Sequence, residues 1–554
     1  MTPPLARLAV FASALVLAAC APEAQLIHVE APGTIVTLVP EQPAVEGLVV
    51  REGKVVAEGT LADLRGAYPQ AVDRNLGPVT LVPGFVDAHV HVRQLGLDAL
   101  RVDVRACLEV ACMVEALRAA EPDPSPGVWI IGQGWDEGVW ASQGYPDRAE
   151  LDAAFPDNPV LLHSLHGFAS FANGVALEAG GIDADTPDPE GGTIVRDDQG
   201  QATGVLLTLA QALVRDQVPA PSLDQRRSAI LAGLWRLAAA GVTTIHEAGM
   251  SSADVEAFMS LAEDGSLPTR VYGLLDGNDE ALVEHWLERG MLVDPQDRLT
   301  IRGFKVFYDG SLGSRTALLA EPYADAPDQA HPTERIRPER LETLAFAARE
   351  ASFQLAVHAI GDEANRRILD LVGETFAGAL GDHRWRLEHA QVMVEADFAR
   401  AAELGVIASM QPSHAVGDSA WAEERLGPER AALAYAWRRF LDAGAVLTLN
   451  SDLPGEPWRP LETLQFAVTR QPLDGSAPAW FPDQALSVDE ALHAMSVAGA
   501  YAGFAEGRLG QLQAGAWADF VVLEADPRAV EPGAIAAIEL RETWVAGQPL
   551  KFPR

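Results

Sequence analysis

Near the N-terminal end of the chain the sequence reads Val82-Pro83-Gly84-Phe85-Val86-Asp87-Ala88-His89-Val90-His91. A Pro-Gly turn leads into a short apolar run, which predicts a strand that ends in two histidines. Alternate side chains of a strand lie on the same side, so His89 and His91 can point toward one target. Two imidazoles in this arrangement suit a divalent metal such as zinc, and two polar residues at an ordinary strand end are the alternative.

Further strands of the same kind follow. From about residue 82 to 505, apolar runs alternate with helical patterns such as 224–240 and 337–352, which predicts repeated βα units and a parallel sheet. Six later runs end in polar residues, namely 242–247, 299–309, 354–358, 386–389, 405–411 and 446–452. The carboxyl ends of barrel strands share one site. We therefore predict an α/β fold, a TIM-type (β/α)8 barrel over 82–505, with an insertion at about 100–220.

Both ends of the chain differ in character from the predicted barrel. Glycines and polar residues separate short β-prone runs at 47–50, 54–59, 79–81, 515–523 and 541–547. Chain ends commonly lie close together, so these runs can share one sheet structure. We predict a small β-sandwich-like domain formed by residues 20–81 and 506–554.

The composition restricts the partners of the folded body. Of the 554 residues, 48% are hydrophobic and 21% are charged, which is typical of a folded protein. The formal net charge is −37, so nucleic acid and anionic membrane surfaces are repelled. We expect a small-molecule substrate, no nucleic-acid partner, and membrane contact only through an N-terminal lipid. A homodimer remains open.

The N-terminal segment predicts export. Arg7 precedes an apolar run at 8–17 that is too short to span a bilayer. Residues 17–20, Leu-Ala-Ala-Cys, resemble the lipobox of bacterial lipoprotein signal peptides. This resemblance implies that residues 1–19 are a signal peptide and that Cys20 is acylated; an ordinary secretory signal is the alternative. Ala21 after the cysteine favours the outer membrane of a Gram-negative bacterium, with the protein facing the periplasm.

Cys107 and Cys112 are the cysteines that remain after Cys20. Export places them in an oxidising compartment, where a disulfide can form. On one helix, residues five positions apart face away from each other. A bridge therefore requires Cys107 in the loop before the helix that Cys112 begins. Two separate thiols are the alternative.

Thirteen histidines occur in the chain, and four of them end predicted strands. These four are His89, His91, His358 and His389. Asp452 ends a further strand. Neutral imidazoles hold a metal ion, a carboxylate accepts a proton from water, and the metal lowers the pKa of that water to roughly 7. This set of residue types therefore predicts a hydrolytic metal centre.

Several stretches together resemble a known family. They are 83–91 (PGFVDAHVH), 305–317 (KVFYDGSLGSRTA), 357–362 (VHAIGD), 388–390 (EHA), 451–452 (SD) and 515–523 (GAWADFVVL). In this order and over nearly the full length, the chain resembles the amidohydrolase superfamily, in particular its amidohydrolase-3 group.

The resemblance implies a role for each ligand position. His89 and His91 would bind a first metal, and His358 and His389 a second. Asp452 would contact a metal and act as the general base. Lys305 would be carboxylated and bridge two metals, because its carbamate is an anionic oxygen ligand. A lysine cation that orients substrate or pairs with Asp309 is the alternative, so one or two ions, most simply zinc, are expected.

Other polar residues are expected to contact substrate, with a structural role as the alternative in each case. Trp135 and Asp136 resemble a loop that lines the family's pocket, and His166 matches a histidine suited to polarising a substrate carbonyl. His246, with Glu247, could contact substrate or support the metal ligands. Arg315 could pair with a substrate carboxylate or anchor its loop. The residues just before His166 depart from the family pattern, which leaves the substrate open.

The expected function is hydrolysis of a carbon–nitrogen bond in an amide, N-formyl or N-acyl amine by metal-activated water. The catalytic residues would be Asp452 and His166. Deamination of an amino-heterocycle is the alternative on the same metal site, since Trp135 and Trp140 could stack on such a ring. A non-catalytic binding lipoprotein is the remote alternative, because all six expected ligand positions carry the expected residue types.

Overall fold

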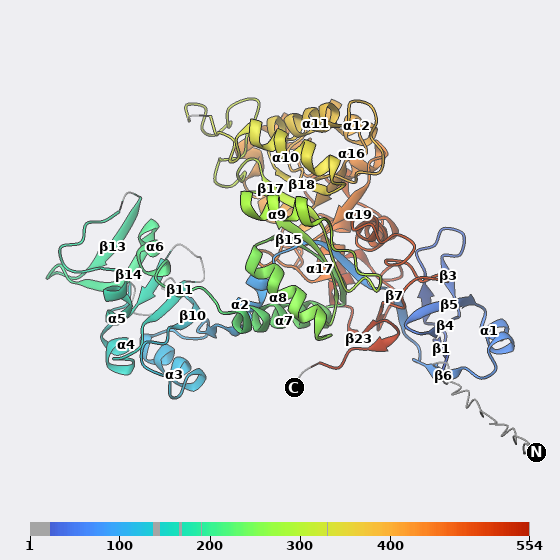
Figure 1. Ribbon diagram of the computed structural model, residues 1–554, viewed down its shortest axis with the longest axis horizontal. Helices are drawn as coiled ribbons and strands as arrows, with labels where there is room; N and C mark the ends of the chain where they lie inside the picture. The colour runs from blue at the N-terminus through green and yellow to red at the C-terminus, as the bar shows by residue number, and fades with distance from the viewer. Residues whose placement is uncertain (1–22, 137–144, 165–168, 190, 330, 553–554) are drawn as a thin grey trace, which may run out of the picture.

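A parallel barrel forms the centre of the molecule (Figure 1). The computed structural model describes residues 23–552 apart from 137–144, 165–168, 190 and 330. The eight barrel strands are β8 (Phe85–Val90), β15 (Val242–Met250), β16 (Arg270–Asp276), β17 (Leu299–Phe307), β18 (Gln354–Ala359), β19 (Arg386–His389), β20 (Ile407–Met410) and β21 (Leu447–Leu449). β21 closes the ring beside β8, where Asp452 donates its backbone N–H to the His89 carbonyl at 3.0 Å. The predicted barrel is confirmed, and β16 is the one strand that the sequence pattern did not reveal.

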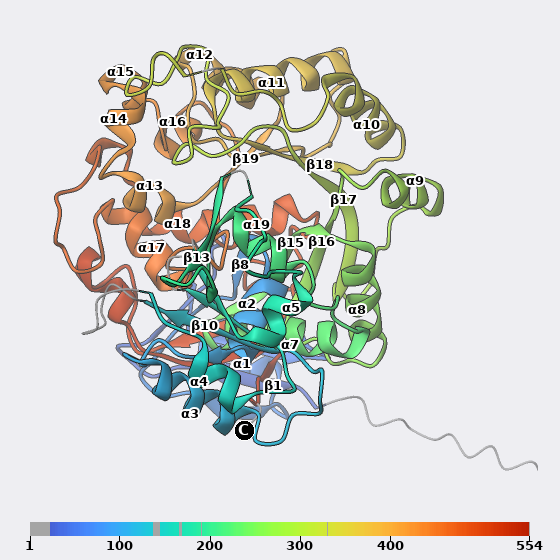
Figure 2. The same ribbon diagram turned by 90° about the vertical axis from the view of Figure 1, so that its left-hand side faces the viewer.

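Helices surround the barrel (Figures 1 and 2). The main ones are α7 (Leu223–Ala239), α8 (Ser252–Glu263), α9 (Glu280–Arg289), α10 (Pro338–Glu350), α11 (Asp362–Phe376), α12 (Glu395–Glu403), α16 (Trp437–Asp442), α17 (Pro460–Thr469), α18 (Val488–Ala494) and α19 (Val497–Ala502). α7 begins at a capping box between Ser222 and Gln225, and buries an apolar face along its length. Within the described part of the chain, no helix is long and apolar enough to cross a bilayer.

Helix α2 (Val92–Leu100) follows β8 directly and has His91 as its N-cap residue. It packs on α7 so closely that no side chain fits between the two backbones at Gly96. A Cβ on Gly96 would lie 1.6 Å from the Ala229 carbonyl oxygen, so only glycine fits there. At the N-terminus of α2, the Glu247 carboxylate accepts the first N–H of the helix, that of Val92, at 2.8 Å. That N–H would otherwise lack a partner inside the helix. The chain just after His91 is therefore held from two sides.

Two sheets beside the barrel combine both ends of the chain. One sheet contains β5 (Lys54–Gly59), β4 (Gly47–Arg51), β1 (Gln25–His28) and β6 (Val72–Asn75). The other contains β24 (Gln548–Pro549), β23 (Leu540–Val545), β22 (Phe520–Leu523), β7 (Thr80–Pro83), β2 (Thr34–Val36) and β3 (Ala44–Val45). A shared apolar core that includes Leu48, Leu81 and Phe520 lies between them. β7 runs straight into β8, so this sandwich is joined rigidly to the first barrel strand.

The segment between α2 and α7 forms a separate layered unit. Its mixed sheet contains β9 (Val102–Asp103), β10 (Ile130–Trp135), β11 (Val160–Ser164), β12 (Ala169–Ala172), β14 (Ala202–Thr208) and β13 (Gly192–Arg196). Helices α3 (Val110–Ala120), α4 (Ala149–Ala154), α5 (Gly174–Ala179) and α6 (Ala212–Arg215) accompany it. The unit has apolar cores of its own and stands apart from the barrel, beyond α2 (Figure 1).

A disulfide joins Cys107 and Cys112 in this unit. α3 begins at Val110, so Cys107 lies in the turn before the helix and Cys112 in its first turn. This is the arrangement that a bridge between the two positions requires. The alternative of two separate thiols is therefore wrong.

Candidate metal centre

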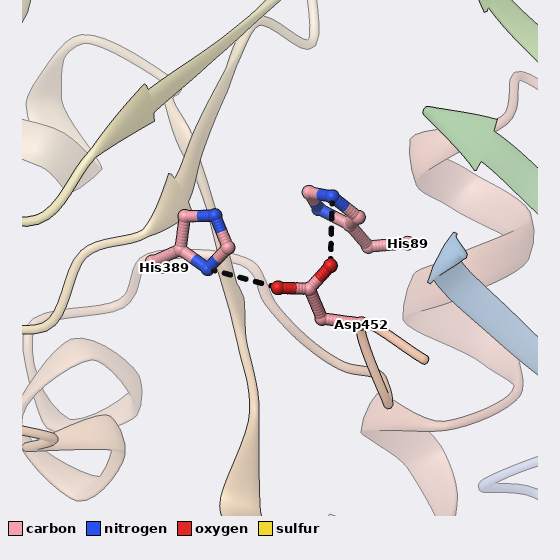
Figure 3. A group of neighbouring side chains, drawn as sticks. All are labelled: His89, His389 and Asp452. Carbon is pink, nitrogen blue, oxygen red and sulfur yellow. Dashed lines mark ion pairs between the residues drawn. The ribbon is translucent and has the colours of Figure 1, made fainter. Parts of the chain in front are cut away.

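His89, His389 and Asp452 meet at the carboxyl ends of the barrel strands (Figure 3). Asp452 Oδ1 lies 3.4 Å from His89 Nε2, and Asp452 Oδ2 lies 3.8 Å from His389 Nδ1. His91 Nε2 lies 3.3 Å from the same Asp452 Oδ1. One carboxylate thus faces three imidazoles that come from two different strands.

Lys305 and His358 complete the cluster. Lys305 Nζ, on β17, lies 3.5 Å from His89 Nε2. The His358 ring, on β18, has its centroid 4.5 Å from that of His389. The structure therefore brings all six predicted ligand residues to one rim of the barrel.

The backbone is strained where two of these side chains leave their strands. His389 has φ of 78° and Asp452 has φ of 51°, both in the left-handed region. Such conformations cost a non-glycine residue about 1–3 kcal/mol and are common at functional sites. In both residues the unusual backbone directs the side chain into the cluster.

Neighbouring acceptors fix which ring nitrogen each buried histidine presents. His89 Nδ1 lies 2.6 Å from Glu388 Oε2, and His358 Nε2 donates to the Gly310 carbonyl at 3.0 Å. The remaining His358 nitrogen, Nδ1, is buried without a hydrogen-bond partner among the described residues. An unprotonated imidazole nitrogen left in this way is a fitting metal ligand.

The protonation states also suit a metal. Burial lowers the pKa of His89, lowers that of His358 to about 3, and holds that of His389 well below its ordinary value. Burial acts to raise the pKa of Asp452, but the nearby imidazoles outweigh it and hold that pKa well below its ordinary value. Neutral imidazoles next to an ionised carboxylate form a donor set for a divalent metal such as zinc.

Lys305 is fully buried, and burial lowers the pKa of its amine. The expected alternative partner, Asp309, accepts the backbone N–H groups of Leu318, Ile360 and Gly361 at 2.9–3.0 Å. Asp309 also lies 3.6 Å from His358 Nε2. The geometry thus directs Lys305 to the histidines, and Asp309 to the loops that support His358.

His414 is a member of the site that the sequence analysis did not identify. It lies on α13 (Pro412–Asp418), immediately after β20. Its Nε2 is 3.9 Å from Asp452 Oδ2, and its ring stacks on that of His389 with centroids 6.1 Å apart. The side chain is 19% exposed, whereas that of His89 is 1% exposed. The polar ending of the β20 run was the available signal, but no spacing rule connects that strand end to a histidine in the first turn of the following helix.

Trp135, which is expected to contact substrate, is a buried side chain in this structure. Trp135 ends β10 in the core of the inserted unit, where it is 0% exposed and donates its indole N–H to the Leu162 carbonyl at 2.9 Å. Asp136 follows it and is half-buried. His166, Trp140 and Cys20 lie outside the described residues.

His246 and Arg315 also differ from the expected substrate contacts. His246 is buried beneath the cluster, with Nδ1 3.0 Å from Arg386 Nη1 and its ring on Tyr272. It supports the site from below, which was the alternative role. Arg315 Nη2 donates to Asp325 Oδ2 at 2.6 Å, and Arg315 Nε to Asp325 Oδ1 at 3.1 Å. Arg315 therefore anchors its own loop.

Comparisons with known proteins place the chain within a family. The model of the amidohydrolase family matches residues 75–550. The chain is 33% identical over 531 residues to the amidohydrolase-family protein YtcJ of Bacillus subtilis (strain 168). This match covers 93% of this chain and 98% of YtcJ. It is 29% identical over 531 residues to N-substituted formamide deformylase of Arthrobacter pascens, covering 91% and 94% of the two chains. The crystal structure of an uncharacterized metal-dependent hydrolase from Pyrococcus horikoshii OT3 matches with a TM-score of 0.75 and 28% identity, over 92% of this chain and 99% of that one.

Proposed function

Because this chain is a metal-dependent hydrolase that belongs to the amidohydrolase family, we propose that it cleaves a carbon–nitrogen bond of an amide, N-formyl or N-acyl amine. The observation that carries the proposal is the gathering of Lys305, Asp452 and four histidines at one rim of the barrel. Among the residues that the structure describes, the buried His358 Nδ1 has no hydrogen-bond partner, and this supports the proposal further, because such an acceptor is costly unless something binds there.

In this proposal the ligands are His89, His91, Lys305, His358, His389 and Asp452. Lys305 contributes as a carbamate: its neutral amine attacks carbon dioxide, a C–N bond forms, and a proton leaves. The lowered pKa of Lys305 favours this step, because only the unprotonated amine is a nucleophile. The product would be an anionic oxygen ligand that could hold a divalent metal such as zinc together with the histidines.

The bound metal would supply a Lewis acid that polarises the substrate carbonyl and lowers the pKa of water to roughly 7. Asp452 acts as the general base, since its carboxylate borders the histidines and is 18% exposed. It takes a proton from the attacking water and delivers it to the leaving nitrogen. His414, beside the same carboxylate, binds the substrate by hydrogen bonding, and His166 is proposed to polarise the carbonyl.

Deamination of an amino-heterocycle is the less favoured reaction. It needs flat side chains that stack on the ring, and Trp135 is buried in the core of the inserted unit. The relative named N-substituted formamide deformylase favours an acyclic substrate in the same family. Assays with a panel of N-formyl amines, N-acyl amines and aminated heterocycles distinguish the two reactions by their products. Amide hydrolysis releases an amine and a carboxylic acid, whereas deamination releases ammonia.

We also propose that the protein is an exported lipoprotein, anchored through Cys20 and facing the periplasm. The disulfide between Cys107 and Cys112 supports export, because disulfides persist in oxidising compartments. Cys20→Ser should move the protein from the membrane fraction to the soluble fraction. If this variant stays with the membrane, the lipid anchor is refuted.

Bound metal per chain tests the central proposal. Protein purified without chelator should contain about two equivalents of zinc, and Lys305→Ala should contain one or none. One equivalent in both proteins would show a mononuclear site without a bridging Lys305. No metal after purification, and none taken up on addition, would refute the metal-dependent hydrolase.

A further inference from the structure

The geometry points to Glu388 as the positioning residue of His89. We propose that the buried pair of Arg386 and Glu388 determines which nitrogen of His89 faces the metal site. The inference rests on the proposed function, because it concerns the presentation of a metal ligand.

The first step is the contact between His89 and Glu388. His89 Nδ1 and Glu388 Oε2 are 2.6 Å apart, and the two side chains are 1% and 0% exposed. The other carboxylate oxygen, Glu388 Oε1, lies 2.7 Å from Arg386 Nε, and this permanent cation favours the ionised carboxylate. An ionised carboxylate only accepts hydrogen bonds, so Nδ1 carries the proton of His89.

The opposite nitrogen is thereby left unprotonated. His89 Nε2 faces Lys305 Nζ at 3.5 Å and Asp452 Oδ1 at 3.4 Å, inside the cluster. Metals bind the unprotonated nitrogen of imidazole, and a carboxylate on the other nitrogen also raises its basicity. Without Glu388 the tautomer with the proton on Nε2 becomes accessible, and that tautomer cannot bind a metal through Nε2, the nitrogen that faces the cluster.

Arg386 holds Glu388 in place. The two residues alternate along β19, so both side chains point to the same side of that strand. Arg386 Nε lies 2.7 Å from Glu388 Oε1 in an ion pair. Arg386 Nη2 donates to the Ala88 carbonyl at 2.5 Å and to Ser409 Oγ at 3.0 Å.

His246 completes the support from a fourth strand, since its Nδ1 faces Arg386 Nη1 at 3.0 Å. One guanidinium therefore ties β8, β15, β19 and β20 together directly beneath His89. A buried ion pair is weak evidence for stability, because desolvation offsets the attraction. Because Glu388 contacts His89, a predicted metal ligand, the pair of Arg386 and Glu388 serves to position that ligand and not to stabilise the fold.

The same chain offers a matched control in Arg270 and Asp519. Arg270 Nε and Nη2 donate to the Asp519 carboxylate at 2.5 and 3.1 Å, and both side chains are buried. This pair lies between the barrel and the β sandwich and contacts no histidine of the cluster. Loss of either pair disturbs a buried charge, but only the loss of Glu388 changes the tautomer of His89.

The experiment measures the dissociation constant of zinc(II) by chelator competition, and the visible absorption of the cobalt(II) form, for full-length variants. Glu388→Gln should weaken zinc binding by about 10–100-fold and change the cobalt spectrum. Glu388→Asp, which keeps the carboxylate, should recover part of the affinity. Asp519→Asn should lower the melting temperature while leaving both metal readouts unchanged.

A second variant tests the proposal if Glu388→Gln does not fold. Glu388→Gln leaves Arg386 as an unpaired buried charge, whereas the double variant Arg386→Gln with Glu388→Gln removes both charges. The double variant should show the same loss of zinc affinity. Unchanged affinity and an unchanged cobalt spectrum in the folded variants would overturn the positioning role alone. A wild-type protein that binds no zinc would overturn this inference together with the proposed function.

Discussion

Ser451 joins the last barrel strand to the first through Asp87. Its hydroxyl donates to Asp87 Oδ2 at 2.6 Å, and its backbone N–H donates to Asp87 Oδ1 at 3.1 Å. Asp87 is two residues before His89, and Ser451 directly precedes Asp452. This contact therefore sets the distance between a predicted metal ligand and the predicted general base, which lie more than 360 positions apart in sequence.

Ser451→Ala should lower the free energy of unfolding by about 1–3 kcal/mol, because it leaves a buried carboxyl group without one donor. Urea unfolding of the full-length protein measures this. Thr448→Val is the matched control on β21, since the buried Thr448 hydroxyl has no hydrogen-bond partner among the described residues. That change should be neutral or slightly stabilising. Equal destabilisation by both changes would contradict the role given to Ser451.

Asp452→Asn should separate metal binding from proton transfer. The amide keeps the shape of the side chain but cannot accept a proton, so kcat should fall by about 10²–10⁴. Zinc content should fall by less than half, since the imidazoles and Lys305 remain. Steady-state kinetics and metal analysis on one preparation test both statements. Unchanged kcat would remove Asp452 from the general-base role.

His414→Asn should lower kcat/KM on the order of 10²-fold with zinc content unchanged, because it removes one donor next to the substrate. His383→Asn is the matched control: His383 donates to the Leu404 carbonyl at 2.8 Å and stacks on Phe376, away from the cluster. It should leave kcat/KM unchanged. Loss of zinc from His414→Asn would instead assign His414 to the metal ligands.

The rim of the barrel could be predicted from sequence because two local rules fix it. Alternation places His89 and His91 on one side of a strand, and parallel strands present their carboxyl ends to one site. Neither rule needs a contact between distant residues. His358, His389 and Asp452 follow from the same rules applied to later strands.

The support beneath the rim follows no local rule. His89 and Glu388 are 299 positions apart, and Arg386 and Glu388 have the pattern of ordinary strand residues. The burial of Trp135 follows no local rule either, since its partner Leu162 lies on a neighbouring strand. Gly273 interrupts the apolar pattern of β16, yet a Cβ there would lie 2.4 Å from Met250 Sδ. A larger residue at this position would therefore require the flexible Met250 side chain to move.

The stability of the fold at acid pH should depend on the ion pair between Arg315 and Asp325. The hydrogen bond from Arg315, reinforced by Arg425, lowers the pKa of Asp325 from 3.8 to about 2. A carboxylate with a lowered folded-state pKa contributes stability that is complete above its ordinary pKa. That contribution is lost as the pH falls through the folded-state value. The pair should therefore stabilise the fold fully above pH 4 and progressively less between about 4 and 2.

Asp325→Asn should lower the melting temperature at pH 7, and the difference from wild type should shrink as the pH falls below 4. Thermal unfolding followed by circular dichroism between pH 7 and the acid limit of folding measures this. Asp328→Asn removes an exposed carboxylate from the same loop and should leave the melting temperature unchanged throughout. A difference for Asp325→Asn that stays constant down to pH 3 would show that the ionised pair does not hold the loop, and would return Arg315 to the candidates for substrate binding.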